Sequence, residues 1–151
     1  MEVSTPTPRP AVTPQAQPRD RQVGAVCALL LLVGMPFGWL SDASTGDVIA
    51  MSVAIVICLL LIGWLIMEFV PRERVRMPAR AGRTALIFGV LAFIGIAVFW
   101  TGLPFALGAA AIALGLSARE AAPAGGKGQA TAAVILGGLG VLASFVALLV
   151  G

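Results

Sequence analysis

Histidine and tyrosine are absent from this chain of 151 residues, and only two cysteines are present. Without histidine, the usual general base of enzymes and a common metal ligand are both missing. Cys27 and Cys58 lie in different apolar segments, at depths that differ by about 12 Å for a rise of 1.5 Å per residue, too far for a disulfide. We therefore expect no catalytic residue, metal site or cofactor, and we predict that both cysteines are small packing residues.

Charged residues are also scarce, at 11% of the chain against 59% hydrophobic residues and a mean hydropathy of +1.00. A soluble domain carries about 25% charged residues, so this composition is typical of a membrane protein. Asparagine is missing, lysine occurs once, and alanine, glycine and arginine are abundant, which is typical of a GC-rich bacterial genome. We therefore expect the protein in the bacterial cytoplasmic (inner) membrane.

Five apolar segments divide the chain, and each is close to the ~20 residues that cross the hydrocarbon core. They cover residues 23–40, 48–70, 84–101, 102–118 and 130–150. Backbone groups in lipid must bond within their own segment, and barrel strands would alternate polar and apolar residues, which these segments do not. The sequence predicts an all-α integral membrane protein with five transmembrane helices.

The basic residues alternate between the connecting segments. The segment before residue 23 holds three arginines and the segment after 118 holds Arg119 and Lys127, whereas 41–47 and the turn 101–104 hold none. Basic residues near membrane ends stay in the cytoplasm, so we predict the N-terminus inside and the C-terminus outside. The arginines of the segment 71–83 are expected to contact lipid headgroups; they are Arg72, Arg74, Arg76, Arg80 and Arg83.

Two details agree with this topology. Trp39 and Trp100 fall at predicted outer ends, where an indole suits the headgroup region. Glu68 lies near the inner end of the second span, where it can reach the interface or pair with Arg72.

Because the arginines flank spans and are not interleaved with aromatic residues, we do not expect nucleic acid as a partner. The lipid bilayer is the expected surrounding.

The chain divides into four predicted parts. Residues 1–22 form a disordered, proline-rich cytoplasmic tail, 23–70 a two-helix hairpin, 71–83 an arginine-rich cytoplasmic loop and 84–151 a three-helix unit packed through small residues. An alternative exists for the first span, because Arg19 and Arg21 before it and Ser41-Asp42-Ala43 after it resemble a cleaved secretory signal. We favour an uncleaved span.

The stretch 84–118 is 35 residues long, too long for one span and short for two. The turn 101–104, Thr-Gly-Leu-Pro, contains two helix breakers, so we predict two short spans. A single long span or a re-entrant hairpin is the alternative.

A run of small residues on the last span is the strongest pattern in the sequence. Its members are spaced by three and four residues, which keeps them on one helix face. They are Ala130, Ala133, Gly137, Gly140, Ser144, Ala147 and Gly151. We call this set the small-residue seam and predict that it packs closely against another helix, with Leu139 and Leu142 facing lipid.

The fourth span carries small residues on two opposite faces. One face has Gly108, Ala111 and Gly115, and the other has Ala106, Ala110, Ala113 and Ser117. A helix that is small on both sides suits a position between two neighbours. We therefore expect it to lie between the third and fifth spans.

The C-terminal half resembles a known type of protein. The segment LGAAAIALGLSAR from Leu107 to Arg119, a short glycine-rich loop, and GQATAAVILGGLG from Gly128 to Gly140 are similar to small actinobacterial multi-pass membrane proteins grouped as a domain of unknown function. The resemblance covers about 84–151. It implies a helical membrane fold and a lineage, and the family brings no assigned activity.

We expect a non-enzymatic multi-pass membrane protein that acts as a packing or accessory subunit, as a homo-oligomer or within a larger membrane complex. The alternative is a small oligomeric transport or channel component. A line of buried polar groups would favour transport, whereas wholly apolar contacts between helices would favour the accessory role.

Overall fold

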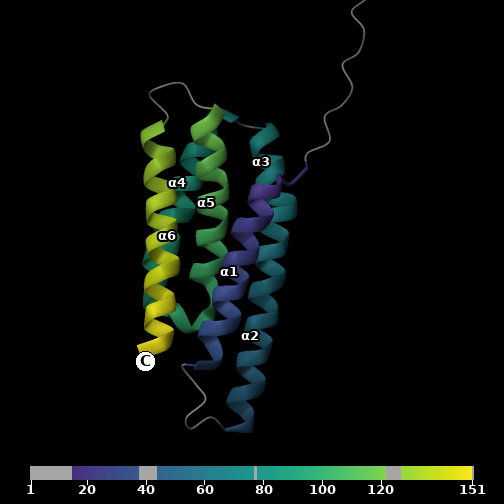
Figure 1. The fold of residues 1–151 in the computed structure, drawn as a ribbon, viewed down its shortest axis with the longest axis vertical. Helices are drawn as coiled ribbons and strands as arrows, with labels where there is room; N and C mark the ends of the chain where they lie inside the picture. Colours follow the sequence, from purple (N-terminus) through teal and green to yellow (C-terminus); the bar gives the residue numbers. More distant parts are fainter. Residues whose placement is uncertain (1–14, 38–43, 77, 122–126, 151) are drawn as a thin grey trace, which may run out of the picture.

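The computed structural model describes residues 15–37, 44–76, 78–121 and 127–150, and this part of the chain is helical without strands (Figure 1). The elements in chain order are α1 (Pro18–Phe37), α2 (Thr45–Trp64), the π-helical turn η1 (Leu65–Phe69), α3 (Val70–Arg76), α4 (Pro78–Ile94), the 3₁₀ helix η2 (Gly95–Thr101), α5 (Leu103–Ala121) and α6 (Lys127–Val150). The long helices run side by side along the long axis of the molecule.

Four helical stretches are long and apolar enough to cross a membrane. They are Thr45–Val75, Arg80–Val98, Leu103–Ala121 and Lys127–Val150. The remaining long helix, α1, has 20 residues, but its first turn contains Arg19, Asp20 and Arg21. For the described residues, the prediction of an all-helical fold with membrane-length apolar helices is confirmed.

Helix α1 begins earlier than the sequence indicates. Its first helical residue is Pro18, within the segment 1–22 that we predicted to be disordered. Proline suits the first helical position because its missing N–H needs no partner there, and the Asp20 carboxylate accepts a hydrogen bond from the Gln17 backbone N–H at 3.0 Å. Residues 1–14 of the predicted tail, and Trp39 with the possible cleavage site at 41–43, lie outside the described residues.

The structure also corrects the predicted loop 71–83, because most of this segment is helical. The helix continues from α2 through η1 into α3 and ends at Arg76, and α4 begins at Pro78. Proline inside a helix lacks an N–H and its ring clashes with the carbonyl four residues earlier. The wider π turn lies directly before Pro71, with a bond from the Val70 N–H to the Leu65 carbonyl, and lets the helix continue past the proline.

The stretch 84–118 lies in two antiparallel helical segments that meet at Gly102 (Figure 1), so it is not one long helix. Gly102 has a φ of 73°, a conformation that favours glycine, and a Cβ there would lie 2.9 Å from Cys58 Sγ. Trp100 lies beside this turn and is 48% exposed. The turn between η2 and α5 is at the end of the molecule opposite the start of α6.

The small-residue seam of α6 faces two neighbouring helices. A Cβ on Gly137 would lie 2.9 Å from Ala111 Cβ and 3.1 Å from the Gly108 carbonyl oxygen, both on α5. A Cβ on Gly140 would lie 2.9 Å from the Ala92 carbonyl carbon and oxygen on α4. The backbones therefore approach as closely as glycine permits, which gains dispersion contacts that larger side chains would prevent.

The other seam residues divide into three groups. Ala130, Ala133 and Ser144 are fully buried, Ala147 is partly buried, and Gly151 lies outside the described residues. On the other side of α6, Leu139 and Leu142 are 49% and 58% exposed.

Helix α5 is the most enclosed of the membrane-length helices. It contacts α4 and α6 as expected, but α4 and α6 also contact each other, so the three helices form a triangle and not a row. Helices α1 and α2 pack against the remaining side of α5, and Phe105 and Leu114, on opposite faces of α5, are both fully buried. Cys27 and Cys58 are buried free thiols of α1 and α2.

The close contact at Gly140 predicts a specific loss of stability. Gly140→Ala should lower the thermal unfolding temperature in detergent, at a cost of about 1–3 kcal/mol, because the new methyl group overlaps the Ala92 backbone. Gly138→Ala is the matched control, since a Cβ at Gly138 meets nothing within 4 Å. Equal losses in both variants would contradict the packing described here.

Candidate functional site at the basic end

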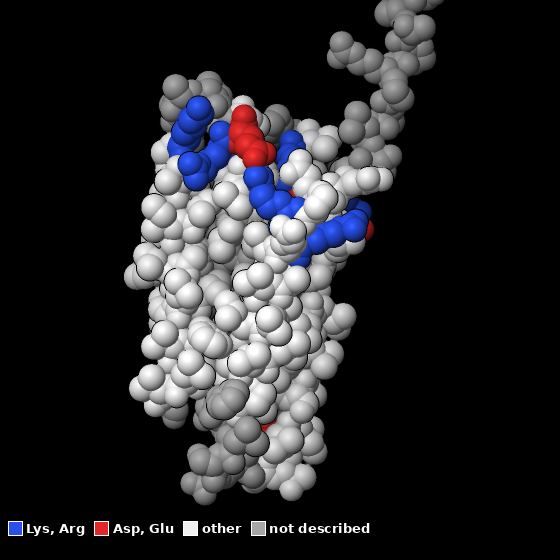
Figure 2. All heavy atoms as spheres, in the orientation of Figure 1, with Lys and Arg blue, Asp and Glu red and all other residues white. Residues whose placement is uncertain are grey.

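Basic side chains gather at one end of the molecule, which we call the basic end. The starts of α1, α4 and α6, the end of α5 and all of α3 meet there (Figure 1). Figure 2 shows the basic residues of the visible face at this end, together with acidic residues. Asp47, in the first turn of α2, lies at the opposite end, where its carboxylate completes a capping box with Ser44.

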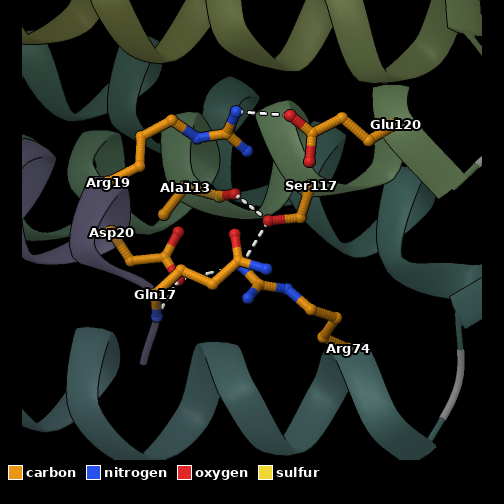
Figure 3. Close-up of polar contacts among 7 residues, drawn as sticks. All are labelled: Gln17, Arg19, Asp20, Arg74, Ala113, Ser117 and Glu120. Carbon is orange, nitrogen blue, oxygen red and sulfur yellow. Dashed lines mark hydrogen bonds and ion pairs between the residues drawn. The ribbon is translucent and has the colours of Figure 1, made fainter. Parts of the chain in front are cut away.

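An ion pair and a hydrogen bond of the same arginine join three helices at the basic end (Figure 3). Asp20 of α1 is fully buried, and its Oδ2 lies 2.9 Å from Nη2 of Arg74 on α3. The same Arg74 Nη2 donates a hydrogen bond to Ser117 Oγ of α5, and this hydroxyl donates to the Ala113 carbonyl at 2.8 Å. We call these three side chains the Asp20–Arg74–Ser117 network.

Local structure brings each member of the network into place. Asp20 occupies the first turn of α1, where the helix dipole favours a carboxylate. Arg74 reaches it because the helix continues past Pro71, which places α3 against α5 and the Arg74 side chain within reach of Asp20 on α1. Ser117 lies one turn before the end of α5, on the side of the helix that is buried.

The arginines that we expected at lipid headgroups therefore differ in exposure and in their partners. Arg74 points inward and its side chain is only 20% exposed. Arg72 is exposed and forms an ion pair with Glu68, which confirms the predicted pairing. Arg80 and Arg83 are exposed at the start of α4, and the side chain of Arg76 lies outside the description.

The network leaves some buried polar atoms without partners. Among the described residues, Asp20 Oδ1 and Arg74 Nε have no hydrogen-bond partner. A buried ion pair gives little net stability compared with an apolar contact. Removal of one partner is nevertheless strongly destabilising, because the other charge then stays buried without compensation. The network therefore makes the position of α1 depend on Arg74.

A second ion pair lies beside the network. Arg19 Nη1 is 2.5 Å from Glu120 Oε1 at the end of α5, and this hydrogen bond raises the pKa of the Arg19 guanidinium. The pair borders a pocket of about 340 Å³ between α1, α5 and α6. Its lining residues are Arg19, Leu116, Arg119, Glu120 and Lys127. We call it the basic pocket.

This arrangement can hold helices together and attract anions. The described residues contain no cluster of His, Cys, Asp and Glu that could hold a metal ion. The Ser117 hydroxyl bonds Arg74 and a backbone carbonyl, and an arginine cannot act as its general base because it stays protonated. The geometry gives no support for nucleophilic chemistry at this hydroxyl.

Comparison of the chain with protein-family models, with curated proteins and with solved structures found no match. The resemblance of residues 84–151 to small actinobacterial membrane proteins therefore stays a prediction. The function has to be argued from the geometry of the chain itself.

The network predicts that two arginines of the same helix differ in importance. Arg74→Gln should lower stability by about 3 kcal/mol, because it leaves the Asp20 carboxylate buried without its cation. Arg72→Gln should cost less than about 1 kcal/mol, because both partners of that ion pair are half exposed. Thermal unfolding in detergent compares the two variants, and a loss at Arg72 as large as that at Arg74 would contradict the role of the network.

Proposed function

We propose that the protein is a non-enzymatic membrane protein that acts as a packing or accessory subunit of a membrane assembly. In this proposal α1, the α2–α3 stretch, α4, α5 and α6 are five spans of a bacterial cytoplasmic membrane. The basic end faces the cytoplasm, with the N-terminus inside and the C-terminus outside. The position of the basic residues at one end of the molecule supports this orientation.

The observation that carries the proposal is the apolar interior of the bundle. In the described part of the chain, the buried polar or charged side chains are Asp20, Ser117 and Ser144. Asp20 and Ser117 belong to the network at the basic end, and Ser144 lies alone on α6. An ion or solute path displays buried acids or unwound helices along its length, so this interior favours an accessory role over transport.

The outer face of α2 supports an accessory role in a second way. Within the stretch Thr45–Val75, a window of 18 residues has a mean hydropathy of 2.9, the highest among the membrane-length helices, and the stretch packs against the rest of the bundle along one side. Large apolar side chains such as Val53, Val56 and Leu60 are 52%, 54% and 68% exposed on its other side. This face is available to lipid or to the helix of another membrane protein.

The proposed orientation is tested by reporter fusions. A periplasmic reporter fused after Gly151 should be active, whereas a cytoplasmic reporter inserted at Met77, between α3 and α4, should be active inside the cell. The reason is the retention of basic segments in the cytoplasm. A cytoplasmic C-terminus would contradict five spans with this orientation.

The accessory role is tested by gentle extraction of the tagged full-length protein from its native membrane. We expect it to migrate in native electrophoresis as a discrete complex larger than one copy. Leu60→Trp, on the exposed face of α2, should reduce that complex, whereas Val146→Trp, at a position on α6 that is 55% exposed against 68% for Leu60, should not. A single-copy species that conducts ions or solutes in proteoliposomes would contradict the proposal and favour the transport alternative.

A further inference from the structure

An apolar groove on the surface is lined by residues of α1, α5 and α6, and α5 lies between the other two helices in Figure 1. It has a volume of about 330 Å³. Val26 and Leu30 line it from α1, Ile112 lines it from α5, and Gly138 and Leu142 line it from α6. Figure 2 shows no charged side chain over the middle of this face, and the residues that line the groove are apolar apart from Gln22 at its upper end.

The groove begins directly below the basic pocket. Arg19 lines the pocket and Gln22 lines the groove, three residues further along α1. On α5, Leu116 lines the pocket and Ile112, four residues earlier, lines the groove. Residues three or four apart share a helix face and are about one turn apart, so the pocket and the groove form one continuous surface with a basic upper end.

The groove closes before it reaches the other end of the molecule. A Cβ on Gly34 of α1 would lie 3.0 Å from Phe145 and 3.2 Å from Leu148 of α6, so the two helices are in contact there. Along α1 the groove extends from Gln22 to Leu30, which is about 12 Å at a rise of 1.5 Å per residue. This length fits within one leaflet, half of the ~30 Å hydrocarbon core.

The charges at the upper end favour an anion. The pocket contains three cations and one carboxylate, so two positive charges are uncompensated. Glu120 pairs with Arg19. Arg119 and Lys127, on α5 and α6, are exposed and form no ion pair within the described part of the chain.

We propose that the basic pocket and the groove together bind one anionic phospholipid from the leaflet at the basic end. Its phosphate lies between Arg119 and Lys127, and one acyl chain lies along the groove against Val26, Ile112 and Leu142. The proposal rests on the membrane location of the chain, and it does not depend on the accessory role. It differs from general headgroup contacts because it defines one site with a place for the headgroup and a place for the chain.

The shape of the site excludes two other occupants. A membrane-spanning helix of a partner would have to follow the whole height of the bundle, but the groove ends where Gly34 meets Phe145 and Leu148. A free inorganic anion would use the basic pocket and leave the apolar groove empty. A phospholipid has both the charge and the chain that the two parts of the site require.

The experiment measures lipid binding to the full-length protein by native mass spectrometry from detergent micelles. Dioleoyl phosphatidylglycerol should bind about 25-fold more tightly than dioleoyl phosphatidylcholine, if each uncompensated charge contributes a factor of about five. The double variant Arg119→Gln/Lys127→Gln should remove this preference. Arg21→Gln/Arg83→Gln is the matched control, because it removes two exposed cations of the basic end outside the pocket and should retain the preference.

A second pair of variants tests the groove. Gly138→Leu should weaken the binding of both lipids, because its side chain enters open space within the groove. Gly63→Leu adds the same side chain in open space on α2 and should leave binding unchanged. Equal binding of the two lipids by the unchanged protein would overturn the proposal, as would equal effects of the two leucine variants. Displacement of phosphatidylglycerol by millimolar inorganic phosphate would show an anion site without an acyl-chain site, which also overturns it.

Discussion

The backbones of α4, α5 and α6 contact one another at glycine and alanine residues, and the rest of the structure depends on that contact. Within lipid there is no hydrophobic drive between helices, so association relies on van der Waals contact over a close interface. Gly137 against α5 and Gly140 against α4 bring α6 to both partners at once. The resulting triangle fixes α5 at the centre, and α5 in turn provides the surface on which α1 and α2 pack.

The basic end follows from the same arrangement. With α5 central, its final turns carry Ser117 and Glu120. Ser117 accepts a hydrogen bond from Arg74 of α3, and Glu120 pairs with Arg19 of α1. The ion pairs among the described residues lie at this end, and below it the buried side chains are small or apolar apart from Ser144. One end therefore joins α1, α3 and α5 through polar side chains, while small and apolar side chains fill the body of the bundle.

Much of the fold could be predicted from the sequence because its main signals are local. Apolar length predicts helices, and the spacing of Ala133, Gly137 and Gly140 predicts a packing face on α6. The sequence could not show that this face divides between two helices, since spacing does not identify a partner. The network was missed for another reason. The arginine-rich composition of 71–83, between two apolar segments, suggested a loop at Arg74, and the prolines before Asp20 suggested a disordered tail, although Pro18 and Asp20 also fit a helix start.

The central claim is that the small-residue seam of α6 packs against α5 within one chain. Cysteine cross-linking tests it most directly, in a background with Cys27→Ala and Cys58→Ala. The account predicts that Ala111→Cys/Gly137→Cys forms a disulfide within one chain under mild oxidation, because the two Cβ positions are 2.9 Å apart and a small shift brings them to disulfide geometry. Ala111→Cys/Gly138→Cys should not cross-link. Disulfide-linked dimers, or equal cross-linking of both pairs, would contradict the account.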